Sequence, residues 1–224
     1  VRQKIPVISV DCKKKELIGL FCKPGRTLRK VALEVLSTDF PSDAKGKAIP
    51  YGIYDVRHNE GHMVVGVSHE TAEFVIAAIR RWWLEIGSVR YQGSRQLLIQ
   101  ADSGGANACD SWLWKVGLQT LADEFHLAIT VTHYPAGASK WNLIEHRMFS
   151  AISRNWAGQP LVSYETMLKF IRTSKTRTGF RCLAAFDRRK YQTKCKASFE
   201  EKENLNLRLH NVFPLWNYTV KPHV

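Results

Sequence analysis

From residue 68 onward the chain alternates between stretches with helical periodicity and short apolar runs, and this alternation limits the folds available to it. Val75, Ile79, Trp82 and Ile86 recur at helical spacing after Ser68, a residue type that often caps helices. The elements predicted next are a strand over 96–101, a helix over 107–126, a strand over 128–133 and a helix over about 141–156. Strands that are separated by helices pair in parallel through right-handed crossovers.

The first part of the chain favours an antiparallel meander instead. The β-branched run 5–10 predicts a strand that ends on Asp11. The other predicted elements are a short strand over 17–21, a polar loop or insertion over 23–47, and strands over 49–55 and 62–67 joined by a polar turn. Together these elements predict an α/β, RNase H-like fold: a mixed five-stranded sheet, an antiparallel meander plus two parallel strands, flanked by helices.

The last third of the chain is more polar. It predicts a helix over 164–173, a basic stretch, and a polar helical segment near 198–209. A chain of 224 residues suits one domain, so we expect a core over 1–160 and a C-terminal helical and basic extension of the same domain over 161–224. No apolar run approaches the roughly 18 residues of a membrane span. Because no signal peptide stands at the start either, a cytoplasmic protein without a membrane partner is expected.

Three carboxylates stand where this fold would bring them together. Asp11 and Asp102 each follow an apolar strand directly, which places them at the carboxyl ends of strands. Glu145 begins a helical face that continues through Phe149 and Ile152. Because that apolar face must pack on the sheet, we expect the glutamate to lie near the sheet edge. Taken singly, each acid would more often be a helix cap, a turn residue or a surface charge.

An all-oxygen set of ligands suits hard divalent cations such as Mg²⁺ or Mn²⁺. Two such ions about 3.5–4 Å apart can activate an attacking oxygen and stabilise a leaving oxygen in phosphoryl transfer. The charge of the chain points to the same chemistry, because 33 Lys and Arg against 20 Asp and Glu leave a net charge of +13. Such a surplus favours polyanion partners, although it also occurs in unrelated basic proteins. The five cysteines form no CxxC pair, which favours free thiols over a zinc site.

Three segments of the chain resemble the catalytic blocks of one known family. They are residues 7–19 (VISVDCKKKELIG), 98–107 (LIQADSGGAN) and 133–149 (HYPAGASKWNLIEHRMF). In this order and with their surroundings they are similar to the Rhodopirellula-type DDE transposases, an insertion-sequence family related to the mariner-like elements. The similarity continues through residues 47–52, 71–74, 79–83, 155–156 and 216–219, and so covers nearly the whole chain.

The resemblance implies an RNase H-like fold and magnesium-dependent cleavage of DNA at element ends, followed by transfer of the exposed 3′-hydroxyl into target DNA. It implies that Asp11, Asp102 and Glu145 form the metal-binding triad, with two Mg²⁺ or Mn²⁺ ions. It also suggests a homodimer that bridges two ends in the bacterial cytoplasm, associated with the nucleoid. Such transposases usually carry an N-terminal helix-turn-helix region. This chain begins just before the first catalytic strand and without a methionine, so a fragment or a shortened reading frame is expected.

Several residues around the triad are candidates for contacts with DNA. They are Lys13 and Lys14 after the first strand, His133, Lys140 and Asn142 before the Glu145 helix, and the basic cluster Arg188, Arg189 and Lys190. A solvated turn, a helix cap or a structural histidine are the competing interpretations. Asn107 stands five residues after Asp102 and is a candidate either for a cap or for orienting a metal ligand.

Two other functions fit the same residues. A DNA-binding remnant that has lost cleavage would keep the basic charge without the chemistry. Another RNase H-like nuclease, such as a junction resolvase or an RNA–DNA hybrid nuclease, would share both fold and metals. Nicking of DNA with magnesium, and strand transfer from a pre-cut 3′ end, separate these alternatives.

Overall fold

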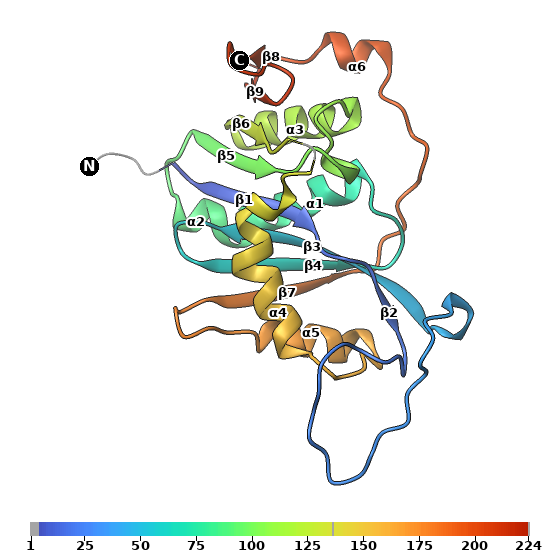
Figure 1. Cartoon of the computed structure of the whole chain (residues 1–224). Helices are drawn as coiled ribbons and strands as arrows, with labels where there is room; N and C mark the ends of the chain where they lie inside the picture. Colours follow the sequence, from blue (N-terminus) through green and yellow to red (C-terminus); the bar gives the residue numbers. More distant parts are fainter. Residues whose placement is uncertain (1–4, 136, 224) are drawn as a thin grey trace.

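The computed structural model describes residues 5–135 and 137–223. Within these residues the strands form one mixed sheet of nine strands, in the order β7-β4-β3-β1-β5-β6-β9-β8, with β2 paired to β3 (Figure 1). The strands are β1 (Val7–Cys12), β2 (Glu16–Ile18), β3 (Gly46–Asp55), β4 (Glu60–Gly66), β5 (Gln96–Ala101), β6 (Ala128–His133), β7 (Arg181–Asp187), β8 (Leu207–Leu209) and β9 (Asn217–Val220).

The centre of this sheet has the predicted arrangement. β3 pairs antiparallel with both β1 and β4, whereas β1, β5 and β6 run parallel to one another. The bounds of β5 and β6 agree with the apolar runs that predicted them. The predicted five-stranded core is therefore confirmed, and four further strands extend it.

Helices cover both faces of the sheet. α1 (Ala72–Trp82), with its π-helical continuation η2 (Trp83–Gly87) and α2 (Ser88–Arg90), lies with α3 (Trp112–Phe125) on one face. The π-helical turn η5 (Glu145–Phe149), α4 (Ser150–Asn155) and α5 (Tyr164–Arg172) pack on the other. Figure 1 shows α4 crossing in front of the sheet. The remaining helical elements are short: η1 (Pro41–Asp43), η3 (Gly105–Asn107), η4 (Ser139–Trp141) and α6 (Phe199–Glu203).

The helix starts are set by side-chain caps. Thr71 accepts a hydrogen bond from the backbone N–H of Phe74 and begins α1, so the cap predicted at Ser68 is wrong by three residues. Ser111 accepts from the backbone N–H of Trp114, and α3 therefore begins later than predicted. In both cases several candidate caps occur close together, and the one whose side chain reaches the exposed N–H groups starts the helix.

Alternation along β1 divides its side chains between two hydrophobic clusters. Ile8 and Val10 are buried among the residues of α1 and α3. Ser9 and Asp11 alternate with them and contact the segment that leads into η5. β1 therefore carries the packing of one layer and the polar contacts of the other.

The C-terminal third differs most from its prediction. β7 lies in the stretch predicted only as basic and pairs in parallel with β4. β9 pairs antiparallel with β6, and β8 with β9. Within the segment predicted as helical, α6 has five residues and β8 follows it. These strands lie toward the edges of the sheet, where exposed and charged side chains dilute the apolar alternation that predicts a strand.

The predicted insertion over 23–47 contains mostly irregular backbone and η1, and Figure 1 shows it extending away from the sheet. β3 begins at Gly46, so the last two residues of the predicted insertion belong to this strand. Among the helices of the described residues, none is long and apolar enough to cross a membrane.

The packing of β3 against η5 predicts the effect of Gly52→Ala. A Cβ at Gly52 would lie 2.6 Å from Cε1 of Phe149 and 2.8 Å from Cδ1 of Ile144. Because a close-packed interior resists an added methyl group, the substitution should lower the free energy of unfolding by about 1–3 kcal/mol. Gly104→Ala is the control, since its Cβ would make an ordinary 3.4 Å contact with Asp102. Urea denaturation of both variants measures the difference, and equal stabilities would contradict this packing.

A second prediction concerns His62 in β4. This side chain is buried, with Nε2 3.3 Å from Oε2 of Glu85, and burial lowers its pKa below the ordinary 6.5, although the charges of Glu85 and Glu60 oppose this. A lowered pKa in the folded state means that folding favours the neutral imidazole. The contribution of His62 to stability is thus complete above the unfolded pKa and is lost as the pH falls through the folded pKa.

Denaturant unfolding at a series of pH values below about 7 tests this. The free energy of unfolding should fall less steeply with decreasing pH in His62→Gln than in the wild type. Parallel pH profiles for the two proteins would show that His62 is not held neutral by folding.

Candidate active site

Asp11 and Asp102 lie side by side at the carboxyl ends of β1 and β5, two central strands. This end of the strands is the sheet edge meant below. In the parallel pair β1–β5, Val10 is in register with Ala101, so the next residues of the two strands are the two aspartates. Neighbouring strands are about 4.8 Å apart, and residues in parallel register point to the same face. The pairing of β1 with β5 therefore brings the two strand ends together, as the sequence predicts.

Glu145 begins η5, and two hydrogen-bonded residues connect its helix to β1. The Ser9 hydroxyl donates to Oδ1 of Asn142 at 2.5 Å and accepts from the backbone N–H of Ile144 at 3.3 Å. The Asn142 amide also donates to Oδ2 of Asp11 at 3.5 Å. Ser9 and Asn142 are fully buried. The helix that carries Glu145 is thus fastened next to Asp11 by contacts inside the core.

Negative charge accumulates around Asp11. Burial, and then the neighbouring charge of Asp102, raises the pKa of Asp11 to about 8, with smaller contributions from Glu145 and Glu70. The backbone N–H of Cys12, which donates to Oδ1 of Asp11 at 2.7 Å, opposes this shift. Burial is therefore the main reason why a charged Asp11 is unfavourable here, and the neighbouring acids add to it.

Asp102 is held by the chain around it. The Asn107 amide donates to Oδ1 of Asp102 at 2.9 Å, and Nδ1 of His133 lies 2.8 Å from the Asp102 carbonyl oxygen. Nε2 of His133 lies 2.9 Å from the Tyr218 hydroxyl, which in turn accepts from the Trp114 indole at 2.9 Å. Burial lowers the pKa of His133 and favours its neutral form. Asn107 therefore orients a predicted site residue, and His133 supports the loop behind it.

Glu70, which was not singled out from the sequence, lies in the same place. It precedes α1, far along the chain from the triad, and forms an ion pair with Lys15 at 2.9 Å. It lines one crevice of about 310 Å³ together with Asp11 and Asp102. Its signal in the sequence is weak, because an acid just before a helix is common at helix starts.

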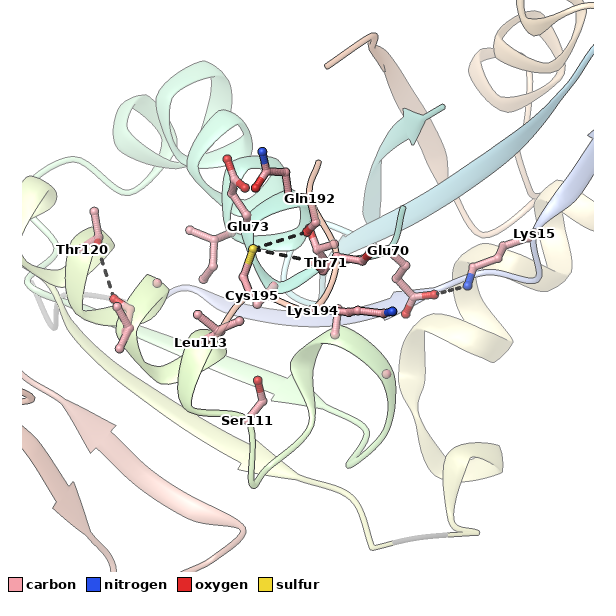
Figure 2. A pocket seen from close by; sticks show the side chains of 17 residues that line it. Lys15, Glu70, Thr71, Glu73, Ser111, Leu113, Thr120, Gln192, Lys194 and Cys195 are labelled. Atoms are coloured by element: carbon pink, nitrogen blue, oxygen red, sulfur yellow. Dashed lines mark hydrogen bonds and ion pairs between the residues drawn. The ribbon is translucent and has the colours of Figure 1, made fainter. Parts of the chain in front are cut away.

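A larger hollow adjoins this crevice. It has a volume of about 700 Å³ and lies between α1, α3 and residues 192–195 (Figure 2). Lys15, Glu70 and Gly105 line both the hollow and the crevice. The carboxylate crevice is therefore open to a wider space on the α1–α3 side of the sheet.

Two of the residues predicted to contact DNA are buried. Asn142 is fully buried and engaged with Ser9 and Asp11, and His133 is nearly so. Lys13 is largely covered, pairs with Glu16 at 3.5 Å and lies 4.8 Å from the centre of the Trp156 ring. Burial lowers the pKa of Lys13. These positions favour supporting roles for the three side chains over direct contacts with DNA.

The other predicted residues are exposed. Lys14 and Lys140 lie on the surface, and the Lys140 ammonium is 5.6 Å from the centre of the Trp141 ring. The cluster Arg188–Lys190 follows β7, which runs parallel to β4 and hence to β1. It therefore lies at the same edge of the sheet as Asp11. Arg189 is bound by Asp187, with Nε and Oδ1 2.9 Å apart.

The donor chemistry of this edge fits a hard divalent cation, because its ligands are carboxylate oxygens. The Tyr51 hydroxyl, fully buried in β3, has no hydrogen-bond partner among the described residues. Burial and the charges of Asp11 and Asp102 raise its pKa well above the usual value. Within residues 5–135 and 137–223, no three His, Cys, Asp or Glu side chains are gathered closely enough to hold an ion as they stand. To hold an ion here, the carboxylates would therefore have to come closer together than they stand.

Comparison with known proteins identifies the family and the fold of the chain. A family model described as Rhodopirellula transposase DDE domain matches residues 1–222. The Mos1 strand transfer complex is similar in fold, with a TM-score of 0.51 and 16% identity over 73% of this chain and 45% of that chain. A Mos1 paired-end complex with the left transposon end has a TM-score of 0.49 and 16% identity, over 73% of this chain and 46% of that chain.

The likeness to the Mos1 strand transfer complex confirms the RNase H-like fold. The chain spans less than half of the length of either Mos1 chain. None of the curated proteins compared with the sequence matches it.

The link between β1 and the Glu145 helix predicts the effect of Ser9→Ala. This substitution leaves Oδ1 of Asn142 and the N–H of Ile144 without their buried partner. The free energy of unfolding should fall by about 1–3 kcal/mol. Ser88→Ala, at a hydroxyl that makes only a 3.4 Å contact with the Leu84 carbonyl, should stay within about 0.5 kcal/mol of the wild type. Thermal or urea unfolding of both variants is the measurement, and a Ser9→Ala protein of unchanged stability would refute the link.

Proposed function

The chain belongs to the Rhodopirellula transposase DDE domain family, and we propose that its Asp11, Asp102 and Glu145 are the carboxylates with which this catalytic domain cleaves and joins DNA. The observation that carries the proposal is the juxtaposition of Asp11 and Asp102 on adjacent parallel strands. Asn142, three residues before Glu145, is hydrogen-bonded to Ser9 and Asp11 of β1, which supports a place for Glu145 beside the two aspartates.

In this proposal Asp11 and Asp102 hold the divalent cations, Mg²⁺ or Mn²⁺, and Glu145 completes the ligand set. When bound, two such ions activate the attacking oxygen and stabilise the leaving oxygen of an in-line displacement at phosphorus. The Asn107 amide keeps the Asp102 carboxylate in position, and the Asn142 amide does the same for Asp11. The raised pKa of Asp11, caused first by burial and then by the charge of Asp102, supports the assignment, since a bound cation would favour the charged carboxylate.

DNA is the substrate class that we infer. The net charge of +13 attracts phosphate, and the exposed cations Lys14, Lys140 and Arg188 lie around the catalytic edge. The solved structure of similar fold is described as a Mos1 strand transfer complex. For this chain we propose cleavage at the ends of an insertion element and transfer of the 3′-hydroxyl to target DNA. Action as a homodimer that bridges two ends stays a prediction.

The test is nicking and strand transfer by the purified chain. With Mg²⁺ and a DNA substrate, Asp102→Asn should lower the cleavage rate on the order of a hundredfold or more, and removal of the metal with EDTA should abolish cleavage. DNA affinity should change little. Asp110→Asn is the control, because this exposed acid lies outside the crevice.

Equal cleavage by Asp102→Asn and the wild type would refute the triad. Strand transfer from a pre-cut 3′ end distinguishes a transposase domain from a nuclease that only hydrolyses DNA. DNA binding without cleavage in any divalent metal would indicate a remnant that has lost its chemistry.

A further inference from the structure

Glu70 is the fourth carboxylate at the catalytic edge. It reaches this place from the segment between β4 and α1, on the face of the sheet opposite the Glu145 helix. Its side chain is 15% exposed, and it lines the crevice of Asp11 and Asp102. Its carboxylate is therefore available to the same small volume as the two strand-end aspartates, from the other side.

The carboxylate of Glu70 is held by two neighbours. Oε2 lies 2.9 Å from the Lys15 ammonium, and Figure 2 shows the two side chains facing each other at one end of the larger hollow. Oε1 occupies the space beside Gly105, where a Cβ would come within 2.6 Å of it. Gly105 belongs to the loop that follows Asp102. Glu70 thus contacts the segments after both strands that end on aspartates.

A second observation concerns a buried tyrosine near these carboxylates. The Tyr51 hydroxyl is fully buried and, within the described part of the chain, lacks a hydrogen-bond partner. Tyr51 is in register with Cys12, the residue after Asp11, so it points to the Glu70 side of the sheet. A buried hydroxyl without a partner is costly. The charges of Asp11, Asp102 and Glu70 all act on it, so the unpartnered hydroxyl lies close to the carboxylates that line the crevice.

We propose that Glu70 is a further ligand of the divalent-cation site, and that the Lys15 ammonium competes with the cation for the Glu70 carboxylate. The inference rests on the proposed metal site and adds to it. Without metal, the Lys15 ammonium neutralises Glu70. When a divalent cation occupies the crevice, Glu70 turns to it, directly or through a bound water, and Lys15 is released toward solvent, where it is free to meet a DNA phosphate.

Competition of this kind predicts effects of opposite sign. Glu70→Gln removes a charge that attracts the cation, so it should weaken binding. Lys15→Met removes the competing ammonium, so it should strengthen binding. In the double variant the Lys15→Met gain should vanish, because no carboxylate remains to be released. A merely structural ion pair would give losses for both single variants, or no effect for either.

The experiment is titration of the whole chain with Mn²⁺, followed by electron paramagnetic resonance or calorimetry, without DNA. Glu70→Gln should weaken Mn²⁺ affinity by about tenfold, Lys15→Met should tighten it by about two- to fivefold, and the double variant should match Glu70→Gln. Glu73→Gln is the matched control, since Glu73 lines the larger hollow but not the crevice. Its affinity should equal that of the wild type.

Asp102→Asn, measured in the same way, separates this inference from the proposed function. If Asp102→Asn binds Mn²⁺ as the wild type does, the proposed metal site itself is wrong. If Asp102→Asn loses Mn²⁺ while Glu70→Gln keeps full affinity, only the role of Glu70 is refuted. Should Glu70→Gln fail to fold, as seen by circular dichroism in EDTA, Lys15→Met alone decides, because unchanged or weaker Mn²⁺ binding by that variant overturns the competition.

Discussion

The parallel pairing of β1 with β5 is the contact on which the catalytic edge depends. It sets Val10 beside Ala101 and thereby places Asp11 next to Asp102. Burial, and then the like charge of Asp102, raises the pKa of Asp11, so keeping both carboxylates charged here is unfavourable. The apolar core on the α1–α3 side must offset that cost, since Ile8 and Val10 of the same strand are fully buried there. β1 therefore carries both the carboxylate whose charge is unfavourable, Asp11, and the buried side chains whose packing offsets that cost.

The opposite face of β1 determines where the third carboxylate lies. A helix packed on a sheet by apolar contacts alone can slide, because those contacts are not directional. Ser9 and Asn142 remove this freedom, since their hydrogen bonds have defined geometry and are inaccessible to water. Gly52 lets η5 approach β3 closely at the same level. Polar specificity and close packing thus act together to keep Glu145 at the edge.

The sequence predicted the parts of this structure that are coded locally. Asp11 and Asp102 end strongly apolar central strands, so their position could be predicted from periodicity alone. The places of β7 beside β4 and of β9 beside β6 could not, because these pairs join residues more than 80 positions apart and the patterns of β7 and β9 are short or diluted by charge. Asn142 looked like a helix-entry residue available to DNA, whereas tertiary packing buries it. Glu70 could not be predicted as a site residue for a related reason, because only the fold brings the start of α1 to the ends of β1 and β5.

The distribution of charge at this edge follows from a conflict between chemistry and substrate. Binding a polyanion needs positive charge, whereas binding divalent cations needs a concentrated group of acids. Its carboxylates gather in one crevice that Lys14 also lines, and the basic cluster after β7 lies at the same end of the sheet. A phosphate approaching the edge would meet lysine and arginine first and would lose most of its repulsion from the acids only once cations are bound. If metal and DNA bind as proposed, this distribution of charge would make metal bind before DNA or together with it.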